Sequence, residues 1–253
     1  MVANFENKLN NLDLHGNFRG CSNENKIRSI LNKVTMKTLD KFKMEMSECI
    51  AQIVTSGSGD ELHASFKLIL NMSSANRGYN AAKYAAIIKE VAGIAPCIHD
   101  QLAVYIDSYK NDLNSLSYVS SLEYDEYCKY IKRRDQLRGS MAMIKTLQMC
   151  GVLPFDVIID VLNFLLVKIQ EWCRVKEKVD HVEELMEHMY LLVVGSIGTL
   201  QMHPIWCQTL FPKIQVISRL RNGTNGNCGV STKAHFRCND VISMQAVAVI
   251  ARK

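Results

Sequence analysis

Apolar residues recur every three or four positions along most of this chain, which is the period of an amphipathic α-helix. A clear case is the stretch from Met36 to about Thr55, where one helix face would carry Leu39, Phe42, Met46, Ile50 and Ile53. The segments between turn signals are long, and the chain contains only 4 prolines. The pattern therefore predicts helices and argues against a string of short strands.

Start and stop signals divide the pattern into ten predicted helices. Thr35 is expected to cap the helix that starts at Met36, and Ser-x-x-Glu sequences at Ser58 and Ser120 are typical of capping boxes that open two others. Proline and glycine mark further boundaries, at Pro96, Gly151, Pro154 and Pro204. The predicted helices cover about residues 25–33, 36–55, 58–75, 79–93, 94–116, 120–150, 154–169, 182–197, 204–220 and 231–250.

Taken in order, these helices form five predicted antiparallel pairs of about 40 to 50 residues, the period of HEAT and armadillo-like repeats. We therefore predict an all-α fold, a right-handed α-solenoid of about five HEAT-like antiparallel helical pairs. Because one pair cannot bury its apolar face alone, residues 24–253 are expected to form a single domain. Residues 1–23 are polar and rich in asparagine, and they are expected to form a flexible leader.

The charge of the chain is mildly basic, with a net charge of +5 at pH 7, which favours RNA or an acidic protein as a partner. The densest group of basic residues lies in the predicted helix 120–150 and consists of Lys129, Lys132, Arg133, Arg134 and Arg138. We predict that these side chains contact RNA phosphates. The alternative is a solvated helix face, since no aromatic platform for stacking bases accompanies the charges.

Chemistry-bearing motifs are missing from the sequence. The 9 cysteines are scattered without a C-x-x-C pair, so they are expected to be reduced core residues. His203 with Cys207, and His181 with His188, have helical spacing, but no further ligands complete a zinc site around either pair. Phosphate-binding glycine loops, nucleophile elbows and H-E-x-x-H are also absent. We expect no catalysis, no cofactor and no metal.

The location of the chain is expected to be cytoplasmic. No stretch reaches the roughly 18 uninterrupted apolar residues that a membrane span needs. Of the two best candidates, Met189 to Leu200 is too short, and Phe155 to Ile169 contains Asp156, Asp160 and Asn163. The polar start MVANFENKLNN also lacks the apolar core of a signal peptide, so no membrane contact is expected.

The segment from Ile27 to Thr35, with the sequence IRSILNKVT, resembles the opening helical pair of the middle domain of eukaryotic translation initiation factor 4 gamma. The resemblance covers about residues 25–245 and continues more diffusely through Tyr84-Ala85, Arg133-Arg134, Gly139 to Asp160, Ser231-Thr232 and Asn239 to Val241. It implies a crescent of five HEAT-like pairs that docks a DEAD-box RNA helicase. The scaffold would thereby promote unwinding of messenger RNA for ribosome recruitment, without chemistry of its own.

The resemblance also implies which residues contact the helicase, because the first pairs of the family touch one helicase lobe and the last pair touches the other. The matching positions here are Asn32, Lys33 and Thr35 near the start, and Ser231, Thr232 and Asn239 near the end. RNA and other initiation factors are further implied partners. The alternative for Asn32 and Thr35 is that they only cap the turn between two helices.

Two departures from the family limit what the resemblance implies. Met36 stands where the family often has proline. No tyrosine is followed at the required spacing by leucine and another apolar residue, so the motif that captures the cap-binding subunit is missing. Related middle domains act in nuclear cap binding, poly(A)-dependent regulation and nonsense-mediated decay. Those roles, or a purely protein-binding scaffold, stay open as alternatives.

Overall fold

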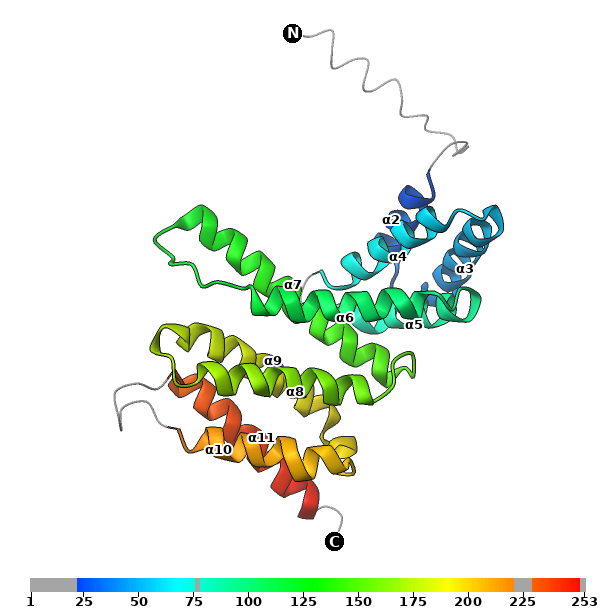
Figure 1. Cartoon of the computed structure of the whole chain (residues 1–253). Coiled ribbons are helices and arrows are strands. Elements are labelled where there is room, and N and C mark those ends of the chain that lie inside the picture. The colour runs from blue at the N-terminus through cyan, green and yellow to red at the C-terminus, as the bar shows by residue number, and fades with distance from the viewer. Residues whose placement is uncertain (1–21, 76–77, 221–228, 251–253) are drawn as a thin grey trace, which may run out of the picture.

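The computed structural model describes residues 22–75, 78–220 and 229–250. These residues form ten α-helices and no strand, which confirms the all-α prediction (Figure 1). The helices are α2 (Asn23–Lys33), α3 (Leu39–Ser56), α4 (Gly59–Ser73), α5 (Ala81–Ile94), α6 (Ile98–Asn114), α7 (Tyr124–Met149), α8 (Asp156–Trp172), α9 (Val179–Leu200), α10 (Phe211–Ser218) and α11 (Thr232–Ile250). The predicted leader, up to residue 21, and most of the predicted loop at 223–229 lie outside the described residues.

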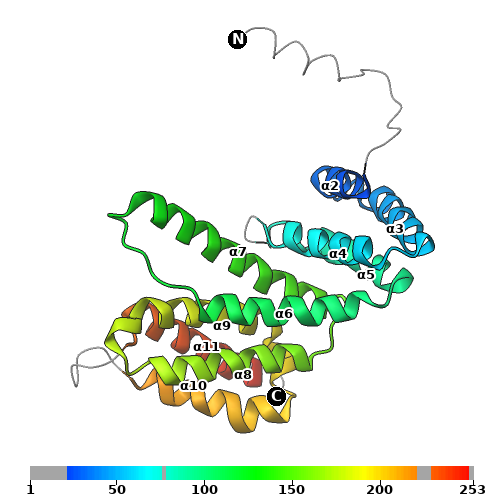
Figure 2. The same cartoon turned by 45° about the horizontal axis from the view of Figure 1, so that its top comes forward.

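Helices that follow one another in sequence also contact one another in space. Contacts join α2 to α3, α4 to α5, α6 to α7, α8 to α9, and α10 to α11. The second members of these pairs form a continuous row, since α3 contacts α5, α5 contacts α7, α7 contacts α9, and α9 contacts α11. The helices α2 and α11 lie at opposite ends of the molecule (Figures 1 and 2). The chain therefore advances along the molecule pair by pair.

The helix α7 is the centre of this arrangement. It contacts α4, α5 and α6 from the first half of the chain, and α8 and α9 from the second half. Gly139 permits the close approach of α7 to the end of α4, because a Cβ atom at this position would collide with the carbonyl oxygen of Ser74. The glycine does not break the helix, which runs without interruption through this position.

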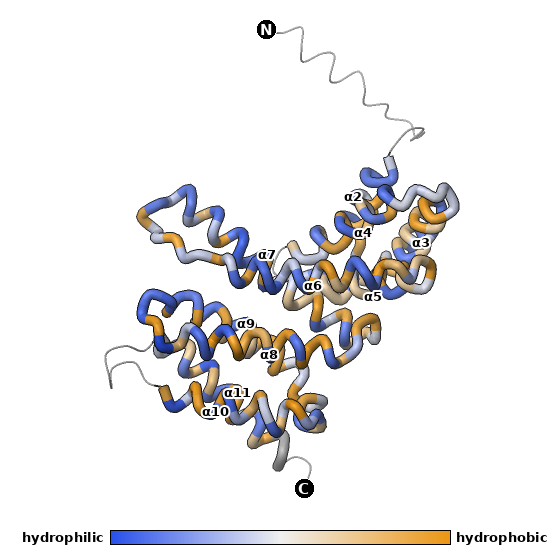
Figure 3. Tube along the Cα trace, viewed as in Figure 1, coloured by the Kyte–Doolittle hydropathy of each residue, from blue (hydrophilic) through white to orange (hydrophobic). Residues whose placement is uncertain are grey.

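The core is formed by the apolar stripes that the sequence predicts. In α3, the stripe residues Phe42, Met46, Ile50 and Ile53 are buried, as are Ile158, Val161, Leu162, Leu165 and Ile169 in α8. Figure 3 shows the same alternation of apolar and hydrophilic residues along most of the chain. Among the described helices, none is both long and apolar enough to cross a membrane.

The start of α3 differs from the prediction. Thr35 does not cap a helix that begins at Met36, because residues 36–38 form a turn and α3 begins at Leu39. The hydroxyl oxygen of Thr38 accepts a hydrogen bond of 3.0 Å from the backbone N–H of Thr35. The two threonines therefore close the turn, and their side chains fix its shape.

One of the two predicted capping boxes forms in part, and the other does not form. The Ser58 hydroxyl accepts from the backbone N–H of Glu61 at 3.4 Å, but the Glu61 carboxylate accepts from the side chain of Asn23 at 2.8 Å. Glu61 therefore joins α4 to α2 instead of returning to its own helix end. At the second site, α7 begins only at Tyr124, and the Ser120 hydroxyl accepts from Leu122.

Candidate functional site

The last residues of α2 and the turn that follows carry the first group of predicted helicase contacts, and we call Asn32, Lys33 and Thr35 the first surface. All three residues are exposed. Met36 continues the same turn with 72% of its surface exposed, although methionine is usually buried. The first surface is therefore accessible, and it lies beside an apolar side chain that a partner could cover.

The start of α11 carries the second group, and we call Ser231, Thr232 and Asn239 the last surface. The Ser231 hydroxyl accepts from the backbone N–H of Ala234 at 3.1 Å and donates to the Glu183 carboxylate at 2.8 Å. The Asn239 amide lies 3.0 Å from His235 Nε2. Ser231 and Asn239 are therefore half-buried and bonded, while Thr232 is exposed.

The predicted RNA-contact residues on α7 divide into exposed and committed side chains. Lys129, Lys132 and Arg133 are exposed. Lys129 pairs with Glu126 at 2.7 Å within the helix, and Arg133 pairs with Asp112 of α6 at 3.0 Å. Exposed pairs of this kind contribute little to stability, so a phosphate group can compete for both cations.

Arg138 differs from its neighbours because it faces the core. Its Nε and one terminal nitrogen donate to the two carboxylate oxygens of Glu184 at 2.7 and 2.6 Å, and only 17% of its side chain is exposed. Arg134 lies over the ring of Tyr130, with 5.7 Å between the guanidinium carbon and the ring centroid. Arg138 thus joins α7 to α9 and is not available to RNA.

Glu184 belongs to a buried polar network that ties α6, α7 and α9 together. His188 places Nε2 3.3 Å from Glu184 Oε1, and its Nδ1 lies 2.8 Å from the hydroxyl of Tyr109. Burial alone would raise the pKa of Glu184, but the neighbouring His188 and Arg138 outweigh it and lower that pKa to about 2. The carboxylate is therefore charged at neutral pH and is held by partners from two helices.

Two neighbouring carboxylates of α9, Glu183 and Glu187, bind α11. Arg237 donates to the two carboxylate oxygens of Glu187 at 2.8 and 3.2 Å, and its guanidinium carbon lies 4.0 Å from the ring centroid of Tyr190. Lys233 pairs with Glu183 at 2.7 Å. These pairs fix α11, and with it the last surface, against α9.

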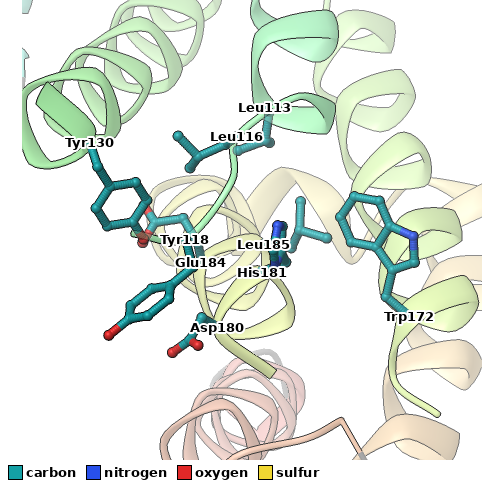
Figure 4. Close-up of a pocket in the computed structure, with 9 residues that line it drawn as sticks. All are labelled: Leu113, Leu116, Tyr118, Tyr130, Trp172, Asp180, His181, Glu184 and Leu185. Carbon is teal, nitrogen blue, oxygen red and sulfur yellow. The ribbon is translucent and has the colours of Figure 1, made fainter. Parts of the chain in front are cut away.

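Aromatic rings pack beside the basic residues of α7, but Tyr130, the ring that the others contact, is buried and offers no free face to a base. The ring centroids of Tyr118 and Tyr130 are 5.8 Å apart, and those of Tyr127 and Tyr130 are 6.2 Å apart. Tyr118 comes from the segment that precedes α7, so the sequence of the helix alone could not reveal this contact. A small pocket beside these rings, which also contains Trp172 and His181 (Figure 4), has a volume of about 10 Å³. It has room for about one water molecule and is too small for a ligand.

A larger polar cleft of about 290 Å³ lies between α4, α6 and α7. Its walls carry mostly amide, hydroxyl and charged side chains, from Asn71, Ser74, Tyr105, Ser108, Tyr109, Asp112, Arg133, Gln136, Leu137 and Ser140. We call this feature the polar cleft. Sequence reasoning missed it because its residues come from three helices, and only Arg133 stood out by its charge.

The residues of the two pairs weighed as metal ligands, His181 with His188 and His203 with Cys207, have other partners in the structure. His188 belongs to the buried network, and His181 stacks edge-on against Trp172 with 5.7 Å between ring centroids. His203 lies 3.5 Å from Asp156, and Cys207 is bonded to the Gln201 carbonyl. Over the described ranges 22–75, 78–220 and 229–250, the structure contains no group of three or more His, Cys, Asp or Glu residues that could hold a metal ion.

Comparison with protein-family profiles and with curated proteins gives no match to this chain.

Proposed function

We propose that this protein is a cytoplasmic scaffold of translation initiation, which binds and activates a DEAD-box RNA helicase and contacts RNA. The observation that carries the proposal is the opening turn, where the stretch resembling the factor 4 gamma middle domain exposes Asn32, Lys33 and Thr35 together. Thr35 is bonded to Thr38 and therefore also shapes the turn. Asn32 and Lys33 instead occupy the last turn of α2 as exposed side chains.

The order of the helices supports the scaffold role. Five successive pairs with a continuous row of second helices are what a HEAT-like array requires, since each repeat contacts mainly its neighbours. We propose that the row is the right-handed solenoid expected from the sequence. Such an array offers an extended surface to a partner, and it needs no catalytic group to act.

The positions of the two surfaces support a helicase with two lobes as the partner. The first surface lies at the α2 end and the last surface at the α11 end of the molecule (Figure 1). A partner that contacts both must span several helical pairs. A rigid scaffold that holds two mobile lobes in one arrangement would favour the active state by binding it more tightly than the open state.

The proposed RNA contact uses Lys129, Lys132 and Arg133, which lie exposed on α7. Arg134 lies beside them over Tyr130, whereas Arg138 is left out because it is paired with Glu184. Binding that depends on such side chains weakens as salt concentration rises, because bound cations are released from the RNA.

A binding measurement with a purified DEAD-box helicase of translation initiation tests the proposal. Lys33→Glu reverses a charge in the first surface, and Thr232→Arg adds a large charged side chain to the last surface. Each variant should weaken helicase binding about tenfold or more. Matched controls are Lys89→Glu on α5 and Thr199→Arg on α9, which change equally exposed residues outside both surfaces.

The controls should bind like the unmodified protein. If the unmodified protein does not bind this helicase but binds a DEAD-box helicase of another messenger RNA process, the scaffold belongs to that process. If it binds neither helicase, the proposal is wrong.

A further inference from the structure

The polar cleft has a shape and a wall chemistry that the helicase surfaces do not use. Its volume of about 290 Å³ is at the small end of the roughly 300–1,000 Å³ range of ligand pockets. Exposed carboxamides stand on two sides of it, from Asn71 of α4 and Gln136 of α7. A side-chain carboxamide offers a donor and an acceptor side by side, which matches the hydrogen-bonding edge of a nucleobase.

The inner wall of the cleft adds further polar groups. Tyr105 lines the cleft, and its buried hydroxyl lies beside the hydroxyls of Ser74 and Ser140. Ser74 and Ser140 lie on the same wall. A polar group that reaches this wall would therefore meet three hydroxyl groups, each of which can donate or accept a hydrogen bond.

Arg133 connects the cleft to the basic face of α7. It lines the polar cleft and also a shallow groove of about 250 Å³ that contains Lys129 and Tyr130. Its ion pair with Asp112 neutralises the carboxylate at the cleft rim. A phosphate backbone in the groove would meet Lys129 and Arg133 directly beside the cleft, and it would replace Glu126 and Asp112 as the partners of these two cations.

We propose that the polar cleft binds one unstacked base of a single-stranded RNA whose backbone follows the groove at Lys129 and Arg133. A duplex is excluded by the size of the cleft and because its bases are already paired and stacked, whereas single strands can turn a base outward. The inference deepens the RNA contact of the proposed function and rests on it. It does not depend on helicase binding.

Fluorescence anisotropy with two labelled 12-nucleotide probes tests the inference. One probe is single-stranded oligoadenylate, and the other is an abasic RNA oligomer with the same number of phosphates. The unmodified protein should bind oligoadenylate more tightly. The double variant Asn71→Ala, Gln136→Ala should lose about tenfold in affinity for oligoadenylate, and its affinity for the abasic probe should not change.

A matched control is the double variant Asn111→Ala, Asn163→Ala, which removes two exposed carboxamides outside the cleft. It should bind both probes like the unmodified protein. Equal affinity of the unmodified protein for the two probes would overturn the inference, and so would an equal loss for both probes in the cleft variant. A cleft variant that loses helicase binding and keeps RNA binding would assign the cleft to a protein partner, which also overturns it.

Helicase binding measured on the same samples separates the two proposals. If the cleft inference fails while the helicase still binds, the proposed scaffold function stands. If helicase binding fails while the base preference is found, only the cleft inference stands.

Discussion

Glu184 of α9 forms an ion pair with Arg138 of α7. The pair shows that the number of basic residues along a helix does not tell how many of them are free to bind RNA. Arg138 belongs to the basic run of α7 in sequence, but its position on the helix turns it toward Glu184. An ion is costly to bury unless a partner and further hydrogen bonds compensate for lost water. Here Arg138 and His188 provide that compensation.

The stability of the fold should depend on pH through Glu184. Its pKa is lowered from 4.5 to about 2 in the folded protein, so the folded state binds this proton less readily than the unfolded state. The resulting stabilisation, roughly 3 kcal/mol, is fully present above pH of about 4.5 and is lost as the pH falls toward 2. Urea unfolding at pH 7, 4.5 and 3 measures it. The variant Glu184→Gln should show a flatter dependence over this range, and an unchanged slope would contradict the assignment.

Replacement of Arg138 should destabilise the protein far more than replacement of an exposed neighbour. Arg138→Met leaves the Glu184 charge buried with one partner fewer, which should cost about 3 kcal/mol. Lys132 lies on the same helix but is exposed. Lys132→Met should therefore change the free energy of unfolding by less than about 0.5 kcal/mol. Chemical denaturation of both variants decides the point. Equal effects would mean that the ion pair with Glu184 contributes nothing.

At the scale of the elements, the hydrophobic period and the helix-end signals predicted every described α-helix, although the predicted helix 204–220 contains a π-helix, Trp206–Leu210, before α10. Helix starts were less predictable. Ser120 and Glu123 have the spacing of a capping box, yet α7 begins at Tyr124, and the Ser120 hydroxyl accepts from the backbone N–H of Leu122 instead. Glu61 likewise bonds to Asn23 of another helix. Contacts of this kind join residues far apart in sequence and leave no local signal.

The packing of α7 on the end of α4 should depend on Gly139. Gly139→Ala should lower the free energy of unfolding by about 2 kcal/mol or more. The new Cβ would overlap the carbonyl oxygen of Ser74, and the backbone of one of the two helices would have to shift to relieve this overlap. Gly93→Ala in α5 is the matched control, since a Cβ there meets no atom within 4 Å. The control should be neutral or stabilise by about 0.5–1 kcal/mol. Thermal unfolding compares them, and a neutral Gly139→Ala would show that α7 does not need this approach.

At the scale of the whole molecule, the candidate sites were only partly predictable. The first surface was predicted by residue number, and its three residues are exposed as a docking surface requires. The polar cleft could not be predicted, because Asn71, Tyr105 and Gln136 meet only after three helices have packed. The pairing of α9 with α11, through Glu187 and Arg237, was hidden for the same reason.

The central claim is that the whole array holds a DEAD-box helicase in its active arrangement. The most direct test is the RNA-dependent ATPase rate of a purified translation-initiation helicase, measured with increasing amounts of the unmodified protein. We predict a saturable increase in this rate, which Lys33→Glu weakens and Lys89→Glu leaves unchanged. An ATPase rate that does not change at any concentration, together with no measurable binding of the helicase, would contradict the account.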